Sequence, residues 1–381
     1  MPFTPLVLRE KKQLMQFSIE REEIVRHLAI VCGVVERRHT LPILFNVLLS
    51  VEDSRLSLTA TDLEVEIRTT LEVLHPKGGK TTVSARKFLD ICRALPSRAV
   101  LEVHHEKGQF HVHSGQSRFT LGTLPAEDFP STDSLEEVVE LELTQAELKQ
   151  LLHQTVFCMA HQDVRYYLNG LLLELGEEAI YAVATDGHRL AVASLEKGPR
   201  REGVHIQSII PRKAVLELVR LLGESSEPVR LKFGTNQMGA EFQGLSFSTK
   251  LIDGQFPDYK RVIPVGCEKR FIADREQFKQ ALGRVNILTN DKYRGVRLHL
   301  SNLKLQATVT NLEQESAEEE LEIEYQGESF EIAFNNSYLI DVLNIINTEQ
   351  VKLEFTNANS SCLITPIGEV GSKYVVMPMR L

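Results

Sequence analysis

One short motif recurs three times along this chain, and its regular spacing constrains the fold more than any other feature. Its fullest form spans residues 184–190 and reads Ala-Thr-Asp-Gly-His-Arg-Leu. Residues 60–65 read Ala-Thr-Asp-Leu-Glu-Val, and residues 308–313 give a weaker echo. Its central threonines, Thr61, Thr185 and Thr310, stand 124 and 125 residues apart. Self-similarity at a fixed period is typical of tandem duplication, so the sequence predicts three copies of one domain.

The repeat also sets the expected domain boundaries. The three predicted copies cover residues 15–138, 139–267 and 268–381. The preceding residues 1–14 have neither the apolar region nor the small-residue cleavage site of a secretory signal. We expect either that Met15 is the native start or that residues 1–14 form a disordered extension.

Each predicted copy repeats one pattern twice: a short strand, an amphipathic helix, and then alternating strands. In the first copy Ile24, Leu28 and Val31 recur at helical spacing, within a helix expected at residues 20–35. Alternating apolar residues follow each helix, as half-buried strands require. The sequence therefore predicts an α+β protein in which two helices per copy are backed by antiparallel strands.

Helix start signals support this pattern in the later copies. Thr144 is followed three residues later by Glu147, which is a capping-box signature. Asp274 is the expected N-cap of the matching helix in the third copy. The second helix of each copy is expected at residues 84–91, 211–218 and 336–343.

Composition excludes several classes of protein. The five cysteines are odd in number and include no Cys-x-x-Cys pair, which argues against a disulfide framework and a structural zinc site and fits a reducing cytosol. No apolar run reaches the roughly 20 residues of a membrane helix, so we expect no membrane partner.

Charge is distributed unevenly around a net charge of −9. Arginine and lysine recur along most of the predicted helices, whereas residues 313–331 contain nine glutamates and no basic residue. One interpretation is that both features are ordinary solvated faces, as most charge runs are. The sharper interpretation is a basic helical lining inside an acidic shell.

Two short motifs have both a chemical and a structural interpretation. Residues 78–81, Gly-Gly-Lys-Thr, resemble the end of a phosphate-binding loop, but Leu74 stands where that motif needs glycine, so we predict a turn. Four histidines, at positions 104, 105, 111 and 113, fall on one predicted hairpin. Metal binding is conceivable there, but cross-strand pairing is the favoured interpretation.

The central motif and the chain end each have a structural and a functional interpretation. Asp186 and His188 could suggest an acid–base pair, but the simpler interpretation is a tight turn in which Gly187 supplies a permissive backbone. The C-terminal residues 374–381 are unusually apolar for a tail, with two methionines around a proline. They form either the last strand of the third copy or, in addition, the lining of a groove.

Four blocks of the sequence together resemble the bacterial sliding clamp, the beta subunit of the replicative DNA polymerase III holoenzyme. They are residues 160–170, 184–190, 253–259 and 374–381, and the likeness runs from residue 15 to residue 381. The resemblance implies three tandem copies of a DNA-clamp domain, forming half of a six-domain, head-to-tail homodimeric ring with helices inside and sheets outside. It implies a processivity factor without catalytic activity or cofactor, which encircles duplex DNA and slides along it without reading its sequence.

The resemblance also implies partners and a location. Besides double-stranded DNA and a second copy of the chain, the expected partners are the replicative DNA polymerase, the clamp loader and repair proteins, which would insert short Gln- and Leu-containing motifs. The expected location is the cytoplasm, in association with the nucleoid.

Three sets of site residues follow from the resemblance alone. The implied partner-peptide pocket, between the second and third copies, consists of Arg165, Tyr167, Leu168, Thr185, Gly187, His188, Arg189, Leu190, Pro257, Arg261, Val262, Asn335, Tyr338, Ser361, Val375, Val376, Met377, Pro378, Met379, Arg380 and Leu381. The implied DNA contacts are Arg38, Arg86, Gln162, Tyr166, Arg212 and Lys213. The implied dimer interface pairs Lys87, Arg118, Phe119 and Leu121 with Ile287, Leu288, Glu315 and Glu318.

Two other classes of function lead to different expectations. An enzyme with a dispersed site would need a buried, titrating acid–base cluster, and none is visible in the linear sequence. A transcription-type DNA-binding protein would bind short linear duplexes with sequence preference, whereas a clamp slides off their free ends.

Overall fold

The computed structural model describes residues 15–36, 38, 40–130, 139–197, 205–289 and 294–380. The chain divides into two compact units, Met1–Glu142 with Glu227–Lys250, and Leu143–Ser226 with Leu251–Leu381. We describe each unit by itself. The expected extension at residues 1–14 and the pocket residue Leu381 lie outside the described residues.

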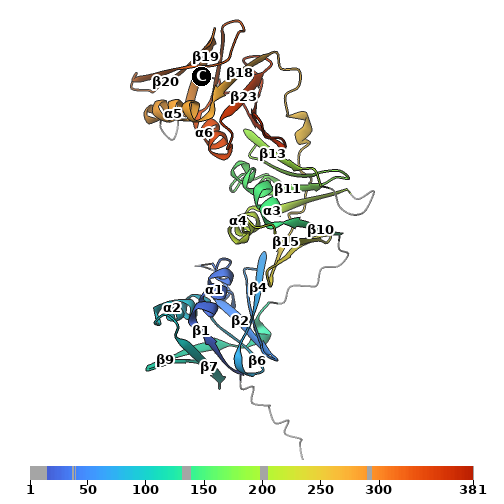
Figure 1. Cartoon of the computed structure of the whole chain (residues 1–381), viewed down its shortest axis with the longest axis vertical. Helices are drawn as coiled ribbons and strands as arrows, with labels where there is room; N and C mark the ends of the chain where they lie inside the picture. The colour runs from blue at the N-terminus through green and yellow to red at the C-terminus, as the bar shows by residue number, and fades with distance from the viewer. Residues whose placement is uncertain are drawn as a thin grey trace, which may run out of the picture. The chain divides into compact units, whose positions relative to one another are not determined.

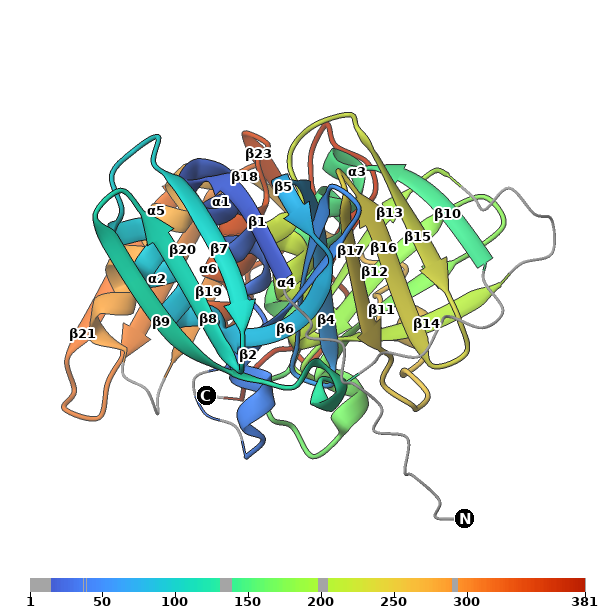
Figure 2. The ribbon, with the colours of Figure 1, turned by 90° about the horizontal axis from the view of Figure 1, so that it is seen from below.

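The first unit is built on a long antiparallel sheet that two helices cover (Figure 1). The strand order is β10-β15-β16-β17-β4-β3-β2-β6-β9-β8-β7-β1-β5. The strands are β1 (Met15–Glu20), β2 (Asn46–Glu52), β3 (Arg55–Thr61), β4 (Val65–Glu72), β5 (Leu74–Lys77), β6 (Gly79–Ser84), β7 (Val100–Glu106), β8 (Gln109–Ser114), β9 (Ser117–Leu124), β10 (Val139–Thr144), β15 (Pro228–Phe233), β16 (Gln237–Phe242) and β17 (Leu245–Lys250). The helices α1 (Arg21–Val31) and α2 (Ala85–Ala94) pack against each other, and Figure 2 shows β7, β8 and β9 side by side.

The second unit contains two further antiparallel sheets. The larger has the order β14-β11-β12-β13-β25-β24-β23-β18, and the smaller has the order β21-β20-β19-β22. Their strands are β11 (Gly170–Leu175), β12 (Ile180–Thr185), β13 (Arg189–Leu195), β14 (Ile206–Pro211), β18 (Lys269–Asp274), β19 (Gly295–Ser301), β20 (Lys304–Thr310), β21 (Ser316–Glu322), β22 (Phe330–Asn335), β23 (Gln350–Phe355), β24 (Cys362–Pro366) and β25 (Ser372–Val376). The helices are α3 (Gln145–His153), α4 (Arg212–Leu221), α5 (Arg275–Val285) and α6 (Asn336–Ile345).

The helices pair as the duplicated pattern predicts. Besides α1 with α2, α3 packs against α4 and α5 against α6, which lie side by side in Figure 1. Over the described part of the chain this makes six α-helices backed by antiparallel strands, so the predicted α+β class is confirmed.

Local signals position the helix starts. The Thr144 hydroxyl accepts a hydrogen bond from the Glu147 N–H, and the Glu147 carboxylate accepts one from the Thr144 N–H, so the predicted capping box is confirmed. Asp274 caps α5 by accepting from the Gln277 N–H at 2.8 Å. These caps satisfy N–H groups that a helix start would otherwise leave unpaired.

The first helix is shorter than predicted. Ile24, Leu28 and Val31 are buried on one face, as their spacing requires, but α1 ends at Val31 instead of at residue 35. The Gly33 N–H bonds to the Ile30 carbonyl at 3.2 Å, a tighter three-residue turn that terminates the α-helical pattern.

The structure separates the alternatives left open for the short motifs. Residues 79–81 begin strand β6, and Gly78 alone separates it from β5, so the turn predicted over residues 78–81 is wrong. Because these residues form a strand and not the start of a helix, they also lack the context of a phosphate-binding loop. His104 pairs across the hairpin with His111, their rings stacked at 4.6 Å between centroids, which confirms cross-strand pairing. Among the described residues, no helix combines the length and hydropathy needed to cross a membrane.

Candidate functional site

Two strand pairings that follow the repeated motif are named. The first seam is the pairing of β4 with β17. The second seam is the pairing of β13 with β25, together with the turn before β13 and the residues after β25. Arg189 faces Val376 and Leu190 faces Val375 in the antiparallel register. The last strand of the chain therefore extends a sheet formed by central residues, and it places the C-terminal residues beside the motif at 184–190.

The turn before β13 is held by its own side chains. The Thr185 hydroxyl donates to the Arg189 carbonyl at 2.7 Å and accepts from the Gly187 N–H at 3.1 Å. One Asp186 carboxylate oxygen accepts from the N–H groups of His188 and Arg189, at 2.9 and 3.0 Å. Gly187 has φ 86°, in the left-handed region that favours glycine. The predicted tight turn is confirmed.

The Arg189 guanidinium is fixed on every side. It donates to Asp186 at 3.0 Å, to Asp341 at 2.5 Å and to the Phe157 carbonyl at 2.9 Å. Its central carbon lies 4.5 Å from the Tyr338 ring centroid and 5.3 Å from that of Phe157. Its side chain is 12% exposed, so these partners compensate the charge for the water contacts that it loses on burial. Arg189 thereby ties β13 to α6.

The chain end runs along the same turn. The Met377 N–H bonds to the His188 carbonyl at 2.9 Å, and the Met379 N–H bonds to the Ala333 carbonyl at 2.7 Å. The Ser361 hydroxyl lies 3.1 Å from the Met377 sulfur. The tail therefore continues past β25 as an ordered extension beside the turn, bonded on both sides of Pro378.

An apolar cluster packs on this seam. Its buried members are Leu172, Val183, Leu190, Val192, Ile209, Phe256, Tyr259 and Val375. The partly buried Tyr167, Tyr181, Ile252, Val262, Ile263 and Leu363 pack against them. Four residues of the predicted pocket thus belong to one cluster, Tyr167, Leu190, Val262 and Val375. The structure also places His188 against Tyr338, with ring centroids 6.4 Å apart.

The remaining residues of the predicted pocket have local roles. The Asn335 side chain caps α6 by accepting from the Ser337 N–H at 3.0 Å. Arg261 is exposed and pairs with Asp258 at 2.8 Å. Of the others, Leu168 and Val376 are buried, Pro257 lines a cavity of about 250 Å³, and Arg380 is exposed.

Arg165 lies directly against the glycine of the turn. It forms a two-point ion pair with Asp163, at 2.9 and 3.0 Å, and a longer bond to the Asp186 carbonyl at 3.4 Å. The hydrogen bonds from Arg165 lower the pKa of the Asp163 carboxyl to about 2. A Cβ added to Gly187 would stand 3.0 Å from two Arg165 nitrogens, so the guanidinium would have to shift by a few tenths of an ångström to admit it.

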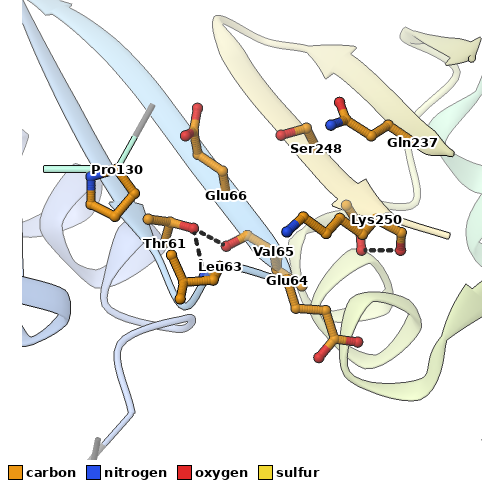
Figure 3. Close-up of a pocket in the computed structure, with 10 residues that line it drawn as sticks. Thr61, Leu63, Glu64, Val65, Glu66, Pro130, Gln237, Ser248 and Lys250 are labelled. Carbon is orange, nitrogen blue, oxygen red and sulfur yellow. Dashed lines mark hydrogen bonds between the residues drawn. The ribbon is translucent and has the colours of Figure 1, made fainter. Parts of the chain in front are cut away.

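The first seam, formed by β4 and β17 in the first unit, contains a polar pocket (Figure 3). The cavity is about 110 Å³ and is lined by Thr61, Leu63, Glu64, Val65, Glu66, Pro130, Gln237, Ser248, Thr249 and Lys250. Glu66 is 11% exposed and pairs with Arg68 at 3.5 Å. In Figure 3 the Gln237 and Ser248 side chains lie next to each other, and the Glu64 carboxylate points away from them.

The residues implied as DNA contacts are divided between the units. Arg38 and Arg86 belong to the first unit, and Gln162, Tyr166, Arg212 and Lys213 to the second. Arg86 donates to the Val35 carbonyl, and Arg212 donates to the Met159 carbonyl. Arg86 is the second residue of α2 and Arg212 is the first of α4, and each ties its helix to the segment that follows the first helix of its copy. Both therefore have a structural role that the sequence did not reveal.

The residues implied as dimer contacts lie on or next to strands β9 and β21 and on the helical segments α2 and 286–288. Arg118, Phe119 and Leu121 belong to β9, which pairs with β8 along residues 117–122, and Lys87 is exposed on α2. Ile287 is 79% exposed in a short 3₁₀ turn after α5 (Asn286–Leu288), which also holds Leu288. Glu318 is exposed on β21, which pairs with β20, and the exposed Glu315 directly precedes that strand.

Sequence reasoning missed the partners that fix these groups. Asp341 and Phe157 hold Arg189, and Glu174 bonds to Tyr259 at 3.0 Å beneath the apolar cluster. The sequence places Asp341 on the predicted helix that corresponds to residues 84–91 and 211–218, but this position alone does not identify Arg189 as its partner.

The three family profiles of the DNA polymerase III beta subunit match the chain in order. The N-terminal domain matches residues 15–133, the central domain residues 142–258 and the C-terminal domain residues 260–380. The "beta sliding clamp" of Pseudomonas aeruginosa is 49% identical over 370 residues, and that of Escherichia coli K12 is 48% identical over 368. Each alignment covers 96% of this chain and 100% of the relative.

Solved structures agree with the sequence relatives. A P. aeruginosa DNA polymerase sliding clamp "with ligand" aligns with a TM-score of 0.94 at 47% identity, covering 96% of this chain and all of the other. A P. aeruginosa clamp bound to griselimycin gives 0.93 at 48%, with the same coverage. A Caulobacter crescentus clamp, with polyethylene glycol "bound to putative beta-motif tethering region", gives 0.92 at 38% and covers 97% of this chain.

Three successive clamp domains and close, full-length relatives leave one assignment. The fold is that of three β-clamp domains, and sliding clamps are non-catalytic processivity factors. The chain belongs to the bacterial β sliding clamp family, the beta subunits of DNA polymerase III.

Proposed function

We propose that two copies of this chain close head to tail into a ring around duplex DNA, and that the second seam binds short peptide segments of partner proteins. The ring would slide without reading sequence and keep the replicative polymerase, the clamp loader and repair proteins at the DNA. One observation carries the ring: the chain has two strand edges of opposite charge, on β9 and β21.

An uncovered strand edge is a template for pairing with another chain. Along residues 117–122, β9 has β8 as its strand neighbour among the described residues, and β21 likewise has β20. Arg118 is exposed at the first edge, whereas Glu318 and Glu320 are exposed at the second. Two different complementary edges on one chain form a head-to-tail contact, and such contacts close into rings when the rotation allows.

Ring size supports two chains. Helices packed side by side lie about 8–10 Å apart, so six in a closed loop give a diameter of about 17 Å at their axes. The grooves of a duplex are about 8 Å deep on either side, so DNA alone exceeds that space. Twelve helices give about 34 Å, which admits a duplex with a layer of water. A ring lined by these helices therefore requires a dimer.

Sliding requires weak contact with phosphate. A continuous basic lining would release many counterions and bind DNA tightly. In this chain the implied contacts are sparse, and Arg86 and Arg212 already donate to carbonyl groups. Retention would then come from enclosure, while the acidic residues on β21 would discourage DNA from binding outside the ring.

The second seam has the chemistry of a peptide site. Apolar side chains lie beside an ordered methionine-containing tail, and methionine surfaces adapt to varied partners. Relatives bound to griselimycin, or to polyethylene glycol at a putative tethering region, support ligand binding by clamps of this family. We assign the pocket, DNA and dimer residues as the resemblance implies them. We also propose domains at 15–138, 139–267 and 268–381 and a nucleoid-associated, cytoplasmic location.

Retention on circular DNA tests the ring directly. The protein, loaded with a clamp loader and ATP onto nicked circular DNA, should stay bound through gel filtration and leave when one restriction cut linearises the DNA. The Leu288→Asp variant should fold but scatter light as a monomer and fail to be retained. Equal retention on linear and circular DNA, or a dimer mass for Leu288→Asp, would contradict the proposal.

A further inference from the structure

Glu174 is a buried carboxylate that belongs to none of the implied pocket, DNA-contact and dimer-contact sets. It lies on β11 between leucines, and its side chain is 4% exposed. A carboxylate removed from water is costly unless charged or hydrogen-bonding partners compensate it. The identity of those partners therefore shows what the fold gains by keeping this residue.

Three groups converge on the Glu174 carboxylate. The Tyr259 hydroxyl donates to Oε2 at 3.0 Å, the Lys260 Nζ lies 3.2 Å from Oε1, and the His205 Nε2 lies 3.2 Å from Oε1. Burial raises the pKa of Glu174, but the hydrogen bonds from Tyr259 and Lys260 outweigh it and leave the pKa below its ordinary value. The carboxylate is therefore ionised near neutral pH.

Two of these partners belong to the connector, which we define as residues 251–268 between β17 and β18. One 3₁₀ turn, Tyr259–Arg261, and one bridge, Ile209 to Ile252, are its regular structure. The connector is attached to the sheet by the buried Phe256 and Tyr259 and by the bonds to Glu174. Lys260 also lies over the rings of Tyr181 and Tyr259, at 5.9 and 5.5 Å.

The connector carries one wall of the proposed peptide site. Val262 packs on the apolar cluster of the second seam, and Pro257 stands two residues before Tyr259. A cavity of about 250 Å³ lies beside this stretch and is lined by Glu174, Pro257 and Tyr259 among others. The side-chain hydrogen bonds that hold its Tyr259–Lys260 turn on the sheet are made to Glu174.

We infer that Glu174 is a positioning residue for the peptide site: it holds the connector so that Pro257 and Val262 stand where a bound peptide needs them. This inference rests on the proposed function of the second seam. Glu174 itself touches neither the tail nor the turn, and it acts through Tyr259 and Lys260.

Peptide affinity of single variants tests the inference. The probe is a fluorescein-labelled hexapeptide containing one Gln and two Leu, followed by anisotropy with the full-length protein. Glu174→Ala should weaken binding about tenfold, and Tyr259→Phe about threefold, since each removes charge-assisted hydrogen bonds. Glu174→Gln keeps an acceptor for Tyr259 but loses the charge that Lys260 needs, so it should fall between the two.

A readout specific to positioning separates this role from general stability. Hydrogen exchange at residues 256–263 should accelerate in Glu174→Ala, while exchange in α5 and the dimer mass stay unchanged. The double variant with Tyr259→Phe should lose less affinity than the two single losses combined, because the two residues share one interaction. Glu217→Ala removes a helix-surface ion pair with Arg220 and is the matched control, which should bind as the parent does.

The outcomes separate failure of the proposed function from failure of the positioning role of Glu174. If the parent protein binds no such peptide, the proposed function of the second seam fails. If the parent binds and Glu174→Ala and Tyr259→Phe bind equally well, this inference alone is wrong. Should Glu174→Ala not fold, Tyr259→Phe decides the matter, since it keeps the aromatic ring in the apolar cluster.

Discussion

The two seams have nearly the same backbone and very different side chains. In the first, the Thr61 hydroxyl donates to the Val65 carbonyl at 2.9 Å and accepts from the Leu63 N–H at 3.0 Å. Asp62 accepts from the N–H groups of Glu64 and Val65, at 2.9 and 2.7 Å. Each bond has its counterpart in the turn at 185–189.

The equivalence continues into the paired strands. Glu66 faces Ser248 in the first seam, as Leu190 faces Val375 in the second. The Lys250 N–H bonds to the Glu64 carbonyl at 3.0 Å, as the Met377 N–H bonds to that of His188. The two seams thus share one backbone hydrogen-bond pattern and one strand register, as duplicated domains would.

The side chains on that frame differ in polarity. The first seam has Leu63, Glu64, Glu66, Gln237, Ser248 and Lys250 where the second has Gly187, His188, Leu190, Ser361, Val375 and Met377. A charged lining keeps its hydration and gains little from apolar ligands. The comparison teaches that the same backbone frame occurs in both seams, and that the second seam carries the apolar side chains of the proposed peptide site.

Exchanging one side chain between the seams should have the largest effect. Met377→Lys places at the second seam the ammonium that Lys250 holds at the first. Binding the labelled hexapeptide would then bury a charge, so affinity should fall about a hundredfold, or about 2.7 kcal/mol. Fluorescence anisotropy measures the change.

The reciprocal variant is its control. Lys250→Met alters the first seam and should leave the affinity of the second unchanged. If Met377→Lys bound the hexapeptide within twofold of the parent, polarity at this position would not separate the seams.

Removing the aspartate of each turn should have a smaller and unequal effect. Asp62→Ala and Asp186→Ala each lose two bonds to backbone N–H groups, but Asp186→Ala also loses an ion pair with the largely buried Arg189. We expect a local destabilisation of about 1 kcal/mol for the first and about 2 kcal/mol for the second. Hydrogen exchange of the turn amides measures both. Equal losses would show that Asp341, Phe157 and Tyr338 hold Arg189 without help from Asp186.

The two turns also show what the sequence could reveal. Thr61 and Thr185 recur with an aspartate one residue later, so a shared turn was predictable from local chemistry. The capping box at Thr144 was predictable for the same reason, because its partners lie within four residues. Fold class and repeat number followed from spacing.

Long-range partners were not predictable in this way. Asp341 lies 152 positions from Arg189, and Tyr259 lies 85 from Glu174. Nothing local distinguishes Asp341 from the other surface acids, since its role arises when β13 and β25 pair and bring α6 to the turn. The resemblance supplied the pocket residues that contact neighbours across the seam, but not the groups that hold them.

Backbone strain gives the smallest and most local contrast. Leu63 has φ 78°, close to the 86° of Gly187, and it is 40% exposed. A non-glycine residue in this region costs about 1–2 kcal/mol, and glycine costs about 0.5–1 kcal/mol in chain entropy. Leu63→Gly should therefore stabilise the first turn by about 0.5 kcal/mol, measured by hydrogen exchange at Glu64 and Val65.

Gly187→Leu is the matching change in the other direction. If strain alone separates the turns, it should destabilise the second by the same small amount. The Cβ would, however, stand 3.0 Å from the Arg165 guanidinium, which is already held by Asp163. We therefore expect a loss larger than the gain at Leu63, with release of the Arg165–Asp163 pair and a rise in the pKa of Asp163 from about 2 toward its ordinary value. Carbon NMR titration measures the pKa of Asp163. Equal and opposite effects on stability, together with an unchanged pKa, would mean that the backbone conformation of the turn requires glycine at 187 and that contact with Arg165 does not.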